Sequence, residues 1–394
     1  MTLSIYKVFV ALIKKINLIK LSIGLIIGGS ITIALLLVIF LIKSSKISLN
    51  QEIDTAIWGQ YGDIVGGVVG TLFSLVGTFL IYITFEEQRK QNKREGFESS
   101  FFEMLRLHRE NVSELNYTKY EFRPIKGHMT TATTRKVFRI IFMEFQECYN
   151  EIKTFTEGIK EDDILEYLYK NKLNSIINNR KIIIKEMALI DISFSIVYYG
   201  SGEEGQVILR DSFKGKYKKE FFIKVLTFMK LKPTKEYNAV YENWRTFTNI
   251  PSKRITIAIN ELCEGNINPN KRDSVKAKSI SDSKYTKYYG GHQHRLGHYY
   301  RHLFQTYKYL ISAKYLTEDE DIFYGKMLRA QLSTYEQALL FINSISSLGM
   351  KWGLTPEPVD IITRYHLIKN LPGTHVSDII FKTYYPGVIY ENEE

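Results

Sequence analysis

Two long apolar runs near the N-terminus dominate the pattern of hydrophobic and polar positions. Residues 21–42 are 22 consecutive residues without a charge, and residues 62–85 carry a single charge, Asp63, next to their start. An α-helix of about 20 apolar residues spans the hydrocarbon core of a bilayer. A signal peptide fits the first run poorly, because the apolar part is too long and no clear small-residue cleavage site follows it. We therefore predict two transmembrane helices.

The placement of Lys and Arg predicts the orientation of these helices. Basic residues precede the first helix and follow the second, whereas the segment between them has only Lys43 and Lys46. Positive charge resists translocation, so both termini are expected in the cytoplasm. The predicted order is a cytoplasmic segment, a membrane helix, an external loop, a membrane helix and a cytoplasmic domain, at residues 1–20, 21–42, 43–61, 62–85 and 86–394.

Small residues recur at four-residue spacing in both apolar runs. They are Gly24 and Gly28 in the first, and Gly62, Gly66, Gly70 and Ser74 in the second. Such a ridge lets helix backbones approach closely, which favours helix association in lipid. Glycine is also common in membrane helices without a special role, and beside this explanation two interpretations stay open. Either the protein's own two helices pack through the ridges, or the second helix forms a homo-oligomer, with or without a pore.

The remaining chain shows helical periodicity, and strand signals are scarce. We predict that the helix from 62–85 continues through charged residues and that the cytoplasmic domain is mainly α. The run 192–199 is ambiguous between helix and strand, and residues 264–291, rich in Asn, Ser and Lys, are predicted to form a polar loop. Further helices are expected near 135–156, 161–199, 218–231, 236–248, 254–264, 293–315, 318–348 and 358–369.

Composition and motifs narrow the functional classes. The 394 residues carry a formal net charge of +11, and 45% of them are hydrophobic, which excludes a polytopic transporter and a disordered chain. Only Cys148 and Cys263 occur, so a disulfide scaffold is excluded. No phosphate-binding loop, nucleophile elbow, zinc-protease or dinucleotide-binding motif is present. The sequence therefore favours a protein that is not an enzyme and needs no cofactor.

One segment is rich in histidine. Four of the eight histidines lie within eleven residues, at His292, His294, His298 and His302. At about 100° per residue, the apolar side of the predicted helix 293–315 accounts for its packing. A separate basic side, which includes Arg295, His298 and His302, is left for solvent or for a site.

Three interpretations apply to this basic side. His294, His298 and His302 form i,i+4 pairs that could chelate zinc, but no local Cys or carboxylate completes a site, and no metal is predicted. Arg295 and His302 resemble the Arg-x6-His signature of HEPN-type ribonucleases. In that chemistry His is a general acid or base and Arg holds the scissile phosphate. The third interpretation is a solvated structural face.

A second amphipathic helix is predicted at 325–346. Arg329, Ser333, Glu336 and Asn343 lie on one side of it, where Arg329 and Glu336 suit interhelical pairing better than catalysis. Because a short connection joins it to helix 293–315, we expect the two helices to pack antiparallel.

Several blocks in order carry a family resemblance. They are WGQYGDIVGG, FESSFFEMLRLHREN, GHQHRLGHYYRHLFQTYKYL, LRAQLSTYEQALLFINS and RYHLIKNLP. From about Trp58 to Pro372 the chain resembles phage abortive-infection membrane proteins (AbiC-like), a family that includes retron-associated membrane effectors. The resemblance implies antiphage defence at the bacterial inner membrane, by membrane damage. Its implied partners are the lipid bilayer, further copies of the chain, and a phage component or a retron reverse transcriptase–nucleic acid complex. It implies no catalytic residue.

Overall fold

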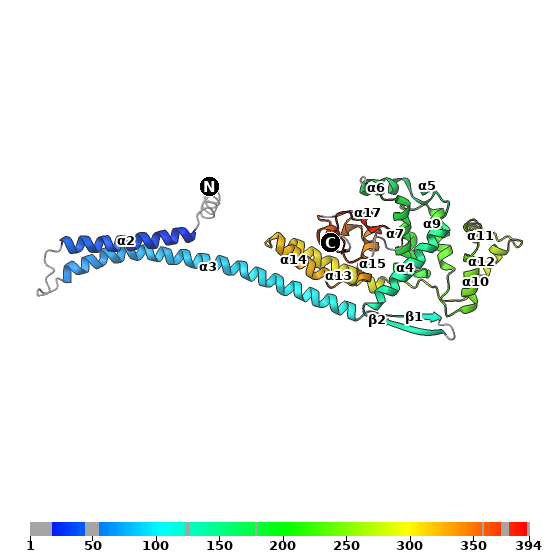
Figure 1. Cartoon of the computed structure of the whole chain (residues 1–394), viewed down its shortest axis with the longest axis horizontal. Coiled ribbons are helices and arrows are strands. Elements are labelled where there is room, and N and C mark those ends of the chain that lie inside the picture. The colour runs from blue at the N-terminus through cyan, green and yellow to red at the C-terminus, as the bar shows by residue number, and fades with distance from the viewer. Residues whose placement is uncertain are drawn as a thin grey trace. The chain divides into compact units, whose positions relative to one another are not determined.

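The chain consists of two units that are mainly α-helical. The computed structural model describes residues 18–43, 55–122, 127–177, 180–356, 358–371 and 378–391 (Figure 1). Within them helices predominate, which confirms the predicted fold class. The two compact units are Met1–Ser100 and Phe101–Glu394. The first contains the two apolar runs, and the second contains all eight histidines.

Two long helices contain the apolar runs. α2 (Leu18–Lys43) has 26 residues and α3 (Thr55–Ser113) has 59. Each has an apolar part long enough to cross a membrane, and most side chains of that part are exposed. At 1.5 Å per residue, α2 is about 39 Å long, more than the hydrocarbon core of a bilayer. α3 continues without a break into its charged part, as the sequence predicts.

α2 packs against the N-terminal part of α3 in antiparallel fashion (Figure 1). The Phe40 ring contacts the rings of Trp58 and Tyr61, with centroids 4.7 and 4.5 Å away. Farther along, Gly29 lies against Phe73, whose ring would be 3.5 Å from a Cβ placed at the glycine. Aromatic side chains and one glycine therefore contribute to the contact between the two helices.

The second unit consists of shorter helices and one β-hairpin. The predicted segment 161–199 is divided into three helices, and the ambiguous run 192–199 is helical. The bounds are α4 (Lys136–Phe155), α5 (Glu161–Ile164), α6 (Tyr167–Ile177), α7 (Ile184–Tyr199), α8 (Glu203–Phe213), α9 (Lys219–Lys230), α10 (Asn238–Thr248), α11 (Ser252–Glu264), α12 (Arg272–Asp282), α13 (Gln293–Ser312), α14 (Glu318–Arg329), α15 (Thr334–Ile345), η1 (Met350–Trp352), α16 (Ile361–Arg364) and α17 (Phe381–Tyr384).

α7 lies at the centre of the core of the second unit. Its residues from Met187 to Val197 are all buried, because α4, α8 and α15 pack around it. A helix that is hydrophobic on every side must be enclosed by protein or by lipid. The β-branched run that made 192–199 ambiguous is thus explained by burial on all sides of a helix.

The β-hairpin was not predicted. β1 (Asn116–Phe122) pairs antiparallel with β2 (Gly127–Thr133), and Asn116 lies opposite Thr133. The strands are largely polar and lack the alternation of apolar and polar positions that identifies a half-buried strand. β2 contacts α4, so packing against that helix supports a strand pair that shows no clear sequence pattern.

The predicted polar loop at 264–291 contains a helix, which corrects that part of the prediction. α12 buries Ser274, Ala277 and Ile280 and packs against α10 and α11. Because only three small or medium-sized residues are buried, the hydrophobic periodicity of this segment was too weak to predict a helix.

The predicted helix 325–346 is two helices, which is a second correction. α14 ends at Arg329 and α15 begins at Thr334, because Ser333 and Glu336 form a capping box. The Glu336 carboxylate accepts a hydrogen bond from the Ser333 amide at 2.8 Å, and the Ser333 hydroxyl accepts one from the Glu336 amide at 3.5 Å. A serine followed three residues later by Glu is the signal that was missed. α13 packs with α14, whereas α15 packs against α4 and α7.

Candidate functional site on helix α13

Backbone hydrogen bonds hold the residues before α13 against the end of α7. The His292 amide donates to the Tyr198 carbonyl at 2.8 Å, and the Ser201 amide donates to the Tyr289 carbonyl at 2.8 Å. Two segments about 90 residues apart in the sequence are therefore joined where the histidine-rich helix begins.

Glycines allow this junction. Gly200 and Gly291 have φ angles of +88° and +86°, a region that side chains rarely adopt. A Cβ at Gly291 would be 2.7 Å from the Tyr199 carbonyl oxygen, and one at Gly205 would be 2.5 Å from the same oxygen. We call these three residues the glycine junction. A side chain at Gly200 or Gly291 would force the two segments apart, and one at Gly205 would clash within the turn between α7 and α8.

His292 belongs to a buried ionic cluster at the start of α13. Its Nε2 lies 2.8 Å from Oε2 of Glu144 on α4, and both side chains are almost fully buried. The same carboxylate accepts hydrogen bonds from Lys119 at 2.9 Å and Tyr117 at 2.8 Å, both on β1. Burial raises the pKa of Glu144, but His292 and Lys119 outweigh it and lower the pKa to about 2. The charged carboxylate thus ties α4, β1 and α13 together.

A second buried ionic group lies on the same face of α4 and was missed in the sequence. The Lys232 ammonium donates to Glu147 at 2.9 Å and to Glu151 at 2.7 Å. Burial raises the pKa of Glu151 in spite of this partner. The signal that could have identified both groups is the spacing of Glu144, Glu147 and Glu151, which places three carboxylates on one helix face.

Arg295 contacts the hairpin. Its Nε donates to the Asn116 carbonyl at 2.9 Å, and its guanidinium lies over the Tyr117 ring, 4.7 Å from the centroid. The Arg295 guanidinium is therefore held against residues of β1.

His302 lies two turns away and contacts a different element. Its ring stacks on that of His108 of α3, and its Nδ1 has no hydrogen-bond partner among the described residues. Burial lowers the pKa of His302. Arg295 and His302 share a face of α13, as predicted, but one faces β1 and the other faces α3. Their predicted catalytic roles stay a prediction.

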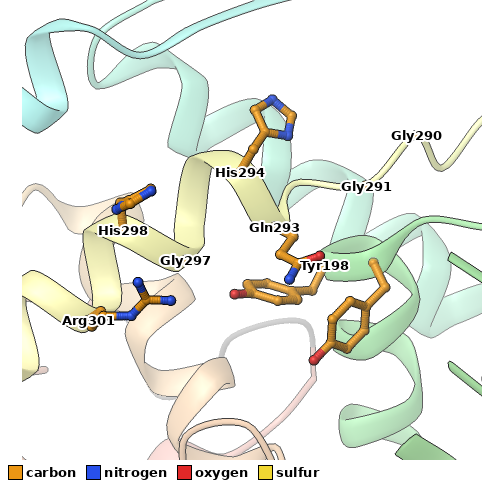
Figure 2. Close-up of a pocket in the computed structure, with 9 residues that line it drawn as sticks. Tyr198, Gly290, Gly291, Gln293, His294, Gly297, His298 and Arg301 are labelled. Atoms are coloured by element: carbon orange, nitrogen blue, oxygen red, sulfur yellow. The ribbon is translucent and has the colours of Figure 1, made fainter. Parts of the chain in front are cut away.

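His298 of the basic side and neighbouring residues of α13 line a pocket with a volume of about 340 Å³ (Figure 2). α13 contributes His294, Gly297, His298 and Arg301, and α7 contributes Tyr198. Figure 2 shows the Arg301 side chain and the Tyr198 ring approaching the pocket from the two helices. Desolvation, with the nearby charges of Arg295 and His292, lowers the pKa of His294. Within the described parts of the chain, no group of three or more His, Cys, Asp or Glu side chains could hold a metal ion.

The small residues predicted to form ridges do not make the contact between α2 and α3. Gly62, Gly66, Gly70 and Ser74, which we call the glycine ridge, are exposed on α3. A Cβ added at any of its three glycines, or at Gly24 or Gly28 of α2, would have no neighbouring atom within 4 Å. Within one copy of the chain, packing through the predicted ridges is therefore not seen.

The C-terminal part of the chain matches the model of a known family. Residues 291–376 match the family described as "Putative phage abortive infection protein". The match begins in the glycine junction and includes α13, α14 and α15, so it covers the last three of the five blocks named above. The chain matches no curated protein and no solved structure. The resemblance to phage abortive-infection proteins predicted from the sequence is thus confirmed by the match over residues 291–376.

Proposed function

We propose that the protein is an antiphage defence protein of the bacterial inner membrane that acts by abortive infection. In this proposal both termini lie in the cytoplasm, and α2 and the apolar part of α3 span the bilayer. A trigger acts on the second unit, and several copies then perturb the membrane through their helices. The family match supports the defence role, and the two apolar helices support the membrane location. The distribution of Lys and Arg supports the orientation.

The observation that carries the proposal is the exposure of the glycine ridge. In lipid, helices gain little from hydrophobic burial, so close approach of backbones over small residues contributes much of their association. The contact with α2 uses Gly29 and Phe73 and leaves the ridge uncovered. A second copy of α3 is the partner that suits such a surface in the membrane.

The rest of the helix surface is consistent with lipid contact. Large apolar side chains are exposed along both helices, among them Ile31, Leu35 and Ile81, each more than half exposed. In water such a surface would aggregate, whereas hydrocarbon accommodates it at no cost. In this proposal, lipid covers the exposed apolar side chains of α2 and α3.

A permeability assay tests the proposal. Cells that express the full chain are infected with a phage against which it protects, and dye entry and membrane potential are followed. We expect entry of a membrane-impermeant dye and loss of potential to coincide with growth arrest, before phage release. Growth arrest in cells that keep their potential and exclude the dye would overturn membrane perturbation while leaving the defence role intact.

A membrane-tethered ribonuclease that uses Arg295 and His302 is the alternative hypothesis. Its support is their spacing and their shared face on α13. Against it stand the contacts of Arg295 with Asn116 and Tyr117, and the position of His302 against His108. Neither side chain lines the pocket beside α13.

A further inference from the structure

Two adjoining pockets form one groove along a face of α13, here called the α13 groove. Their volumes are about 340 and 290 Å³. Both are lined by Tyr198, Gly297 and Arg301, so they meet near the middle of the helix. We propose that the α13 groove binds a nucleotide, with its phosphate near Arg301 and the two histidines and its base at the aromatic end. This inference goes beyond the proposed function and does not rest on it.

The first pocket has the chemistry of a phosphate site. His294, His298 and Arg301 follow at i, i+4 and i+7, which places them on one face of α13. Figure 2 shows His298 and Arg301 projecting from successive turns of the helix. None of the three makes a side-chain hydrogen bond or ion pair within the described residues, and no carboxylate lines either pocket. The positive charge of Arg301 is therefore not compensated by a carboxylate among the described residues.

Arg301 is the side chain best suited to the phosphate. A guanidinium presents its N–H groups in a fixed fork that matches two phosphate oxygens at once. The start of α13 adds to this, because no side chain caps its first turn. The Arg295 amide donates to the His292 carbonyl at 3.0 Å, and the amides of Gln293 and His294, which come before it, favour an anion.

The second pocket has the chemistry of a base site. Phe304 and Trp352 line it, with ring centroids 4.9 Å apart, together with Tyr300 and the amide side chain of Asn343. The Tyr300 hydroxyl is buried and has no hydrogen-bond partner among the described residues. A buried hydroxyl without a partner is costly, and a polar edge of a ligand would satisfy it. Aromatic walls with one or two polar groups are typical of sites that hold a heterocycle.

The size of the groove distinguishes a nucleotide from smaller anions. Each pocket alone is at the lower end of the range of ligand sites, about 300–1,000 Å³. Inorganic phosphate would leave the aromatic pocket empty, and a nucleoside would leave the cations unpaired. Gly297 sets the depth at the centre, because a Cβ there would be 2.9 Å from the Tyr198 hydroxyl.

Binding is tested with the purified full chain in detergent, by calorimetry at fixed pH and salt. The probes are the common ribonucleoside mono- and triphosphates, with inorganic phosphate and the matching nucleosides as fragments. We expect at least one nucleotide to bind at least about 10-fold more tightly than either of its fragments. If no nucleotide exceeds its fragments, or if only an RNA oligonucleotide binds, the proposal is overturned.

Two variants locate the site. Arg301→Ala removes an exposed side chain and should weaken nucleotide binding about 10- to 100-fold, the effect of losing charged hydrogen bonds. Phe304→Ala should weaken nucleotide binding without changing the weak binding of inorganic phosphate. Lys314→Ala, the matched control, removes an exposed positive charge outside the groove and should leave the affinity unchanged. Wild-type affinity in a folded Arg301→Ala protein would place the ligand elsewhere and overturn the proposal.

Discussion

The imidazole rings of His108 and His302 lie nearly parallel, with centroids 6.3 Å apart and planes inclined by 23°. His108 is 1% exposed, and neither of its ring nitrogens has a hydrogen-bond partner among the described residues. Burial lowers the pKa of His108 from 6.5 to about 4, with smaller contributions from His302, Arg135 and Arg109. The folded protein therefore keeps this ring neutral at neutral pH.

Replacing His108 should make folding less sensitive to acid. The unfolded chain takes up this proton near pH 6.5 and the folded chain near pH 4, so folding loses free energy as the pH falls through that window. His108→Phe keeps the aromatic contact with Tyr299 and removes the proton site. Between pH 7.5 and pH 5 the variant should lose about 2 kcal/mol less than the wild type. Thermal unfolding of the full chain in detergent measures this difference.

The control for this experiment is Val207→Ala, which shortens an exposed side chain of α8 and removes no proton site. It should keep the wild-type dependence on pH. The same loss of stability in His108→Phe as in the wild type would show that another group titrates in this window.

Bulk on the glycine ridge should abolish toxicity without preventing membrane insertion. Gly66→Leu and Gly70→Leu place a side chain where the structure shows no neighbouring atom, so the fold of one copy should be unaffected. Close approach of two α3 helices would be blocked. Growth arrest during infection and the membrane fraction of the protein are the two measurements.

Two further variants in the same helices separate association from packing. Val68→Phe adds bulk at an exposed position of α3 outside the ridge and should remain toxic. Gly29→Leu acts on the contact with Phe73 and should weaken the pairing of α2 with α3. Full toxicity of both ridge variants would contradict association through the ridge.

Removal of the Glu144 charge should destabilise the second unit strongly. Glu144→Gln leaves Lys119 without its carboxylate next to buried His292, and breaking a buried ion pair costs about 3 kcal/mol. Glu110→Gln, which removes an exposed partner of Arg106, should cost far less, because exposed ion pairs contribute little to stability. Because the pKa of Glu144 is lowered to about 2, its contribution declines only below about pH 4.5. Melting temperatures at neutral pH compare the two variants.

Loss of the His302 imidazole should leave phage protection in place. In the membrane proposal His302 packs against His108, and His302→Ala changes stability more than activity. Plaque counts on cells with normal amounts of the variant measure protection. Loss of protection in a folded variant, with an intact membrane and RNA cleavage only in the wild type, would favour the ribonuclease hypothesis instead.

The pattern of hydrophobic positions along the chain predicted most of the helices. The uncharged runs identified α2 and the apolar part of α3, and the 3.6-residue pattern identified α4, α9 and α13 within a few residues. Short elements with weak apolar faces were missed, among them the hairpin, α8 and α12. The break between α14 and α15 was readable as the capping box of Ser333 and Glu336, but the continuous apolar stripe obscured it.

Only part of the candidate site could be predicted from the sequence, because its residues come from distant parts of the chain. The histidine-rich helix stood out by composition, and its basic side was correctly separated from its apolar side. Which of its residues line a pocket depends on Tyr198 of α7, on β1 and on α3, and local spacing contains no information about these neighbours. The roles of Arg295 and Arg301 therefore differ in a way that helical geometry alone could not distinguish.

The glycine junction has a genetic consequence. A screen that selects for survivors of the toxic protein would be expected to recover missense lesions at Gly200, Gly205 and Gly291, although the last is about 90 codons from the others. Any missense change in a glycine codon introduces a side chain. Every amino-acid substitution at these three positions is therefore expected to disrupt the glycine junction. Mutations at all three should give the same phenotype in such a screen.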